Sequence, residues 1–402
     1  MSEPDSPSRE NSPGSAQVAR LQRQLASVRQ DLARSQGLKR GKTDPLSTAS
    51  RGFSRLVCLF TDIHALQSEA DYIDALEDGV PDGRDLSLAD RRTCDRMYKS
   101  YCILLELVPQ VGKALMDTSE ILTELLTYLT INQIQLKGNT ARAEDFLKIR
   151  SLLAPIFNGE PYNCLPCLSH ADRSHRGLSS DVLGKLICPI EFDWDDMTVR
   201  ANMRDGEPGF EVATSYYYRC FYRNHKGNPE DVVDGFLRGP LLVQMYQAVF
   251  TAPTSMETEA PEDEGTSEEP PAKRPYQDRG ESKKPTRTNV ATLLNMNGKV
   301  TPRSIAYIAV LLHLNLTDAA AWVPKYNGVS YAGLYNFIVD FFEDHNMRTA
   351  SGRLGKQLAD DCLKWWNKKI FPNAVEQPSD VTSRDKLAAQ LAAKVAAMAQ
   401  QQ

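Results

Sequence analysis

Three aspartates close together in the chain are the residues best suited to hold a catalytic metal ion. Asp193, Asp195 and Asp196 lie within one short stretch, and a second acidic group lies at 340–344. Carboxylates grouped in this way bind the divalent cations that stabilise moving charge in phosphoryl transfer. Helix caps and solvated helix faces account for the same residues without any chemistry. We therefore assign no catalytic residue and keep a metal-dependent enzyme acting on nucleic acid, through the three aspartates, as an alternative function.

A pair of cysteines followed by two histidines is the second arrangement with a chemical interpretation. Cys164 and Cys167 precede His170 and His175. Thiolate and imidazole are the usual ligands of structural zinc, and a closed tetrahedral site would order a long loop. The gap from Cys167 to His170 is shorter than in zinc fingers, and Pro166 separates the cysteines. We expect free thiols and no cofactor, with a zinc site at these four residues as the alternative.

A run of basic residues near the N-terminus gives the best indication of a partner. One acid, Asp31, stands against seven cations: Arg20, Arg23, Arg29, Arg34, Lys39, Arg40 and Lys42. Apolar residues of the same stretch follow the 3-4-3-4 spacing of a coiled-coil seam: Val18, Leu21, Leu25, Val28 and Leu32. We expect residues 18–36 to form a short basic coiled-coil arm that pairs two copies of the chain and contacts phosphates. A solvated helix face explains the same charges.

A strongly charged insert separates two blocks of apolar sequence. Residues 251–272 hold seven acids and no base, and basic residues follow directly. Such a segment buries too little apolar surface to offset its ordering entropy, so we expect 251–290 to be disordered. Its basic half holds two pairs of cations, spaced much like a two-part nuclear import signal: Lys273 with Arg274, then Lys283 with Lys284. This spacing favours a nuclear over a cytoplasmic location.

Helical periodicity dominates on both sides of the insert. Apolar residues within 334–342, for example, recur at i, i+3, i+4, i+7 and i+8. Residues 158–211 lack such a pattern, and we expect mainly irregular chain there with at most a short strand at 185–190. The predicted fold class is all-α or mostly α: an irregular multi-helix domain with long loops, a short N-terminal coiled coil and a disordered acidic and basic insert.

A Gly-Asn pair interrupts one of the longer helical patterns. The pattern begins near Ile121 and reaches Gly138 and Asn139, two residues that disfavour a helix interior. We expect the helix to end there and Thr140 to cap the next one.

These patterns define a domain plan. We expect residues 1–17 to be disordered and 373–402 to form a tail with a short Ala-rich helix. The first helical block covers 52–250 and the second covers 291–372, and we expect the two to form one domain.

Composition restricts the cellular setting. Eight cysteines are scattered through the chain, and the first twenty residues lack an apolar stretch, so we expect reduced thiols, no secretory signal and an intracellular location. No apolar run approaches the length needed to span a bilayer. The net charge of −5 excludes no partner, because a local basic arm matters more than the sum.

Several short segments together resemble a known family. They are Gly138–Asp145, Arg176-Gly177, Gly184–Pro189, Asp193–Asp196, Gly235–Arg238, Val249–Pro253, Lys299–Pro302, Ile305–Tyr307, Tyr335–Glu343, Trp365–Asn367 and Ile370–Pro372. On these segments the chain resembles a large, uncharacterised family of basidiomycete (mushroom-type fungal) proteins, known as a domain of unknown function. The resemblance runs from Phe53 to Pro372 and places the charged insert at a position of variable length. It implies an intracellular fungal setting and no activity, cofactor or catalytic residue.

We therefore predict a non-enzymatic helical interaction protein. Its expected partners are a second copy of the chain and a protein or nucleic acid, with no membrane and no small-molecule substrate evident. A metal-dependent enzyme and a protein-binding scaffold are the alternatives.

Overall fold

The computed structural model describes residues 44–109, 121–169, 171–251, 289–372 and 374, with the backbone alone for 121–127. These residues are mostly helical, as predicted. Residues 1–17, the basic arm at 18–36, the insert at 252–288 and nearly all of the tail lie outside the described residues. The ends of the insert predicted to be disordered are described, and Val290 begins a short helix that runs to Leu293. The described residues from Leu46 onward form one compact unit, which is the helical body of the protein.

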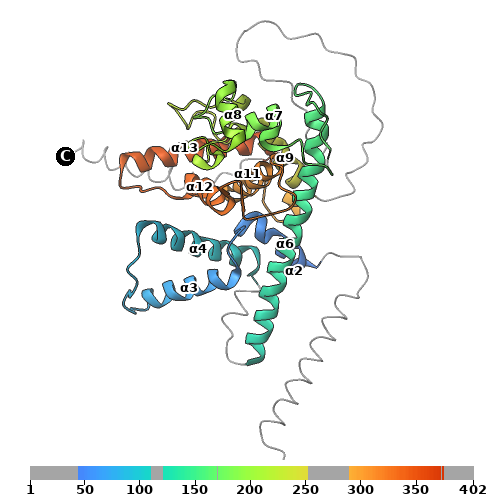
Figure 1. The fold of residues 1–402 in the computed structure, drawn as a ribbon. Coiled ribbons are helices and arrows are strands. Elements are labelled where there is room, and N and C mark those ends of the chain that lie inside the picture. Colours follow the sequence, from blue (N-terminus) through green and yellow to red (C-terminus); the bar gives the residue numbers. More distant parts are fainter. Residues whose placement is uncertain (1–43, 110–120, 170, 252–288, 373, 375–402) are drawn as a thin grey trace, which may run out of the picture. The chain divides into compact units, whose positions relative to one another are not determined.

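Most of the helices are labelled in Figure 1. The helices are α2 (Pro45–Gly52), α3 (Ile63–Glu77), α4 (Leu88–Leu107), α6 (Ile121–Asn158), α7 (Asp181–Ile187), α8 (Met197–Asp205), α9 (Pro240–Phe250), α10 (Val290–Leu293), α11 (Pro302–Leu316), α12 (Tyr331–Glu343) and α13 (Ala350–Ile370). Shorter turns are η1 (Phe53–Val57), η2 (Gly177–Ser179), η3 (Val212–Thr214), η4 (Arg219–Phe221) and η5 (Arg223–His225). Two short antiparallel strands, β1 (Lys325–Tyr326) and β2 (Val329–Ser330), pair with Lys325 opposite Ser330.

Helix α11 is the centre of the core. Every residue from Arg303 to Leu316 is buried, and the helix packs against α12, α6, α9 and η1. Its start is fixed by a capping box, in which the Thr301 hydroxyl accepts from the Ser304 backbone N–H and the Ser304 hydroxyl accepts in return. Pro302 occupies the first helical position, where its missing N–H costs nothing. A helix that is apolar on nearly all sides must lie inside the domain.

Helix α6 is continuous through Gly138 and Asn139, so the predicted break there is wrong. A Cβ on Gly138 would lie 2.9 Å from the Ser54 Oγ and 3.3 Å from Phe53. The glycine is therefore needed for the close approach of η1 and not for a turn. Thr140 is an interior residue of α6, where its hydroxyl donates to the Leu136 carbonyl at 2.9 Å.

The stretch 158–211 contains two helices that periodicity did not predict. Helix α7 covers the first half of the expected strand at 185–190 and is capped by Ser180, whose hydroxyl accepts from the Leu183 N–H. A Cβ on Gly184 would lie 2.3 Å from the Trp194 ring, so the glycine allows this buried indole to lie against α7. The strand prediction is wrong because a short apolar run does not distinguish a buried helix from a strand.

Residues from both helical blocks contribute to one hydrophobic core. The last helix, α13, contributes Trp366, which is fully buried and donates from Nε1 to the Leu237 carbonyl at 3.0 Å. A second apolar cluster lies where η1 and α3 meet α4 and α6, and it includes Phe53, Leu66 and Leu104. Helices α3 and α4 lie side by side in Figure 1. Within the described ranges, no helix is both long and apolar enough to cross a membrane.

Candidate functional site

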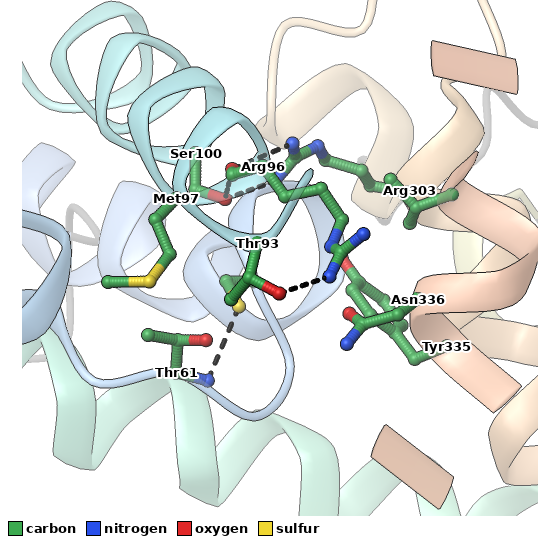
Figure 2. Close-up of a pocket in the computed structure, with 10 residues that line it drawn as sticks. Thr61, Thr93, Arg96, Met97, Ser100, Arg303, Tyr335 and Asn336 are labelled. Atoms are coloured by element: carbon green, nitrogen blue, oxygen red, sulfur yellow. Dashed lines mark hydrogen bonds between the residues drawn. The ribbon is translucent and has the colours of Figure 1, made fainter. Parts of the chain in front are cut away.

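A small polar cleft lies where α4 meets η1, α11 and α12 (Figure 2). Its volume is about 40 Å³, and its lining residues are Cys58, Thr61, Thr93, Arg96, Met97, Ser100, Arg303, Tyr335, Asn336 and Val339. A space of this size holds a few water molecules and no larger ligand. What the cleft can do therefore depends on how its charged groups are already engaged.

Arg303, in the first turn of α11, donates its hydrogen bonds to other groups of the protein. Its guanidinium makes two bonds of 3.0 Å to the Glu343 carboxylate and also donates to the Val57 carbonyl and the Ser100 hydroxyl. Burial opposes its charge, but Tyr335 and Glu343 nearby keep the pKa of Arg303 above its ordinary value. Arg303 therefore ties α11, α12, η1 and α4 together.

The acidic group at 340–344 pairs with arginines of α4. Both Asp340 oxygens accept from Arg96 at 2.8 Å, and Asp344 pairs with Arg92 at 2.8 Å. Burial raises the pKa of Asp340, and the hydrogen bond from Arg96 partly offsets that rise. With Glu343 held by Arg303, each acid of this group has a cationic partner. The group joins α4 to α12 and offers no cluster of free carboxylates.

Two reactive groups line the cleft without an ionic partner. The Cys58 Sγ accepts a hydrogen bond from the Thr61 backbone N–H at 3.3 Å, as Figure 2 shows. The Tyr335 hydroxyl is buried and has no hydrogen-bond partner among the described residues. A buried hydroxyl beside a space of this size is the usual position of an ordered water. The cleft is therefore a joint between helices with room for water beside the Tyr335 hydroxyl.

The three aspartates predicted as an alternative metal site each have a local structural contact. Asp193 accepts from the Asp195 N–H at 3.0 Å, and Asp196 caps α8 by accepting from the Thr198 N–H. Asp195 pairs with Lys185 at 2.7 Å, and the hydrogen bond from this lysine lowers the pKa of its carboxyl group. All three carboxylates are exposed. The three side chains lie in the segment between α7 and α8, where they make a local turn contact, an ion pair and a helix cap.

The alternative zinc ligands are only partly described. Cys164 is buried, Cys167 and His175 are exposed, and His170 lies outside the described residues. Burial raises the pKa of the Cys164 thiol. Among the described residues, no three His, Cys, Asp or Glu side chains gather closely enough to hold a metal ion. With His170 outside that set, the four-ligand site stays a prediction.

The predicted nucleic-acid contacts of the arm and the predicted import signal lie outside the described residues. They are Arg20, Arg23, Arg29, Arg34, Lys39, Arg40, Lys42, Lys273, Arg274, Lys283 and Lys284. Their roles stay predictions.

Buried arginines are the feature that the sequence did not indicate. Arg55 makes a two-pronged pair with Asp145 at 2.7 and 2.8 Å, and the Tyr307 hydroxyl donates to the same carboxylate at 2.8 Å. Arg173 and Arg176 are buried at the C-terminal end of α11. Asp145 and Arg176 do fall in the family-like segments of the sequence, which is the one signal that singled them out.

The comparison with family models identifies the chain's family. The model of a family of unknown function (DUF6698) matches residues 137–371, which is more than half of the chain. The chain belongs to this family. The matched span begins within α6, later than the Phe53 that we expected, and it includes α11 and its flanking arginines. No curated protein and no solved structure matches the chain.

Proposed function

We propose that this protein is a non-enzymatic helical interaction protein that binds nucleic acid through its basic arm. The observation that carries the proposal is the charge of residues 20–42, where seven cations face one acid. A heptad seam at 18–36 supports the further proposal that two copies pair through the arm, which would double the charge presented. The helical body would then supply whatever selectivity the protein has.

The proposed mechanism is electrostatic. Each lysine or arginine that contacts a phosphate releases a counterion, so affinity falls with salt by a slope of about −0.9 per contact on duplex DNA. If about half of the arm's cations contact phosphate, each copy contributes a slope of about −3. The spaced pairs Lys273-Arg274 and Lys283-Lys284 support a nuclear location. The family-like segments support a basidiomycete origin.

The test is binding of the full-length protein to duplex and single-stranded nucleic acid across a salt series. A variant with all seven arm cations changed to Gln keeps the seam and should lose the salt-dependent binding. Leu25→Ala with Leu32→Ala keeps the charge and should lose pairing, measured by sedimentation. The exposed pair Arg348→Gln and Arg353→Gln on the body is the matched control and should bind as the wild type does. Salt-insensitive binding, or none at low salt, would exclude the proposal.

The alternatives have less support. A metal-dependent enzyme needs the carboxylates that now serve as caps and an ion pair at Asp193, Asp195 and Asp196. Unchanged activity on nucleic acid in an Asp195→Ala, Asp196→Ala variant would remove that alternative. A protein-binding scaffold without nucleic acid is the outcome indicated if the salt series shows no binding.

A further inference from the structure

Two buried arginines hold the C-terminal end of α11. Arg173 donates from Nη2 to the carbonyls of Asn315 at 3.3 Å and Thr317 at 3.1 Å, and Arg176 donates from Nη1 to the Asn315 carbonyl at 3.0 Å. These carbonyls carry the partial negative charge of a helix C-terminus, so cations are favoured beside them. Both arginines therefore help to stabilise the C-terminal end of α11.

A third arginine adds its charge to the same place. Arg150, on α6, donates to the Ala320 carbonyl at 2.7 Å, and its guanidinium lies over the Phe146 ring at 4.8 Å from the centroid. The Arg173 guanidinium lies 6.0 Å from the same centroid. The three cations are close enough that the charge of Arg150 lowers the pKa values of both Arg173 and Arg176.

Within the described part of the chain, these three arginines form no close ion pair with an acid. Arg173 is 7% exposed and Arg176 is 1% exposed. Asp318 is the acid that acts on Arg173, and it is exposed, with Oδ1 lying over Gly177. Buried charges are normally paired. Burial, together with the neighbouring arginines, lowers the pKa of Arg173 to about 10.

The same guanidinium groups keep donors that nothing satisfies. The Nε atoms of Arg150, Arg173 and Arg176 and the Nη1 of Arg173 are buried without a hydrogen-bond partner in the described structure. The Asn315 Oδ1, an acceptor, is likewise buried and unpartnered. Carbonyls and an aromatic ring reduce the cost of the charge, but they leave these donors open. A ligand with several acceptor oxygens and a negative charge would accept hydrogen bonds from these donors and balance the positive charge.

We propose that this arginine cluster, formed by Arg150, Arg173 and Arg176, binds a phosphate group. A phosphate offers several oxygens to guanidinium forks and balances more than one positive charge, which a single carboxylate does not. When singly protonated it also has one O–H to donate, which suits the acceptor of Asn315. Arg150 is half-buried and Ala320 beside it is exposed, so this side of the cluster lies nearest to solvent. The proposal does not depend on the basic arm.

The first test is calorimetric titration of the full-length protein with inorganic phosphate at constant ionic strength. We expect saturable binding of one phosphate per chain. Arg150→Gln should weaken it by about tenfold or more, since one charged donor is lost. Arg150 is preferred to Arg173 and Arg176 because it is less buried, so the variant is less prone to unfold; circular dichroism checks this. Arg96→Gln, which removes a paired arginine elsewhere, should bind phosphate as the wild type does.

A second titration distinguishes the sources of the phosphate. In the variant with all seven arm cations changed to Gln, a short oligonucleotide with a 5′-phosphate and the same oligonucleotide with a 5′-hydroxyl compete against inorganic phosphate. Competition by the phosphorylated strand alone assigns the site to a nucleic-acid end. Competition by neither assigns it to a free phosphate compound. No saturable phosphate binding up to about 10 mM, or equal binding by Arg150→Gln, overturns the proposal while leaving the function proposed for the arm untouched.

Discussion

The two ends of α11 treat buried arginines differently. At the N-terminal end, Arg303 is held by the Glu343 carboxylate, so its charge is balanced within the fold. At the C-terminal end, Arg173 and Arg176 donate to backbone carbonyls and have no ion pair among the described residues, and Arg150 adds a further positive charge. The dipole of the helix places roughly half a negative elementary charge at this end, which is far less than the three positive charges of the arginines. The difference indicates that one end is complete in itself and that the other needs an anion.

The largest expected effect comes from breaking a paired arginine. Asp145→Ala leaves Arg55 buried without its carboxylate and removes the partner of Tyr307. Such a change should lower the free energy of unfolding by about 3–5 kcal/mol, because an uncompensated charge stays inside the fold. Chemical denaturation measures it. The double variant Arg55→Met, Asp145→Leu should recover most of the loss, and a single-variant loss below about 1 kcal/mol would contradict the pairing account.

A second effect appears on acidification, through a histidine near the C-terminal end of α11. His313 is fully buried between Tyr218 and Tyr331, and burial lowers its pKa to about 3. In the folded protein it stays neutral at pH 5, whereas the unfolded chain takes up a proton below about pH 6.5. Stability is therefore present above pH 6.5 and is lost as pH falls towards 3.

The histidine's share of that loss is measurable by difference. Between pH 6.5 and pH 5 it should amount to about 1.6 kcal/mol, because the slope rises from half of 1.36 kcal/mol per pH unit at pH 6.5 towards the full value. Denaturation curves of the wild type and His313→Gln at both pH values test it, since the variant lacks the titrating group. Equal losses in the two proteins would show that His313 does not carry the effect.

A smaller effect is expected from removing an unpaired arginine. Arg173→Met loses two hydrogen bonds to carbonyls but also removes a buried charge beside Arg150 and Arg176. In chloride buffer these effects should nearly cancel, leaving a loss below about 1 kcal/mol. A loss as large as that of Asp145→Ala would show that buried arginines with and without an acidic partner do not differ, and the comparison between the two ends of α11 would fail.

The smallest effect is expected at the rim of the joint between α4 and α12. Arg92 and Asp344 form an ion pair whose side chains are 51% and 41% exposed. Exposed pairs of this kind contribute little, so Arg92→Gln should change the free energy of unfolding by less than about 0.5 kcal/mol. Thermal unfolding at low and high salt measures it. A loss of several kcal/mol would mean that the exposed pair, and not Arg303, holds the joint.

The sequence predicted the helical class well and the charged contacts poorly. The apolar stripe at 334–342 is a local pattern, and it matches helix α12. The helix break predicted at Gly138 is wrong because the reason for this glycine lies in η1, far away in the chain. An arginine that will be buried is indistinguishable in sequence from an exposed one, because its partner is set by tertiary contact.

The most direct test of the difference between the two ends of α11 is the free energy of unfolding in chloride and in phosphate at equal ionic strength and pH. For the wild type, phosphate at 100 times its dissociation constant should add about 2.7 kcal/mol. Arg150→Gln should gain far less at the same phosphate concentration, and Arg96→Gln should gain as much as the wild type. Equal stabilisation of all three proteins, or none, would show that the C-terminal end of α11 has no place for an anion.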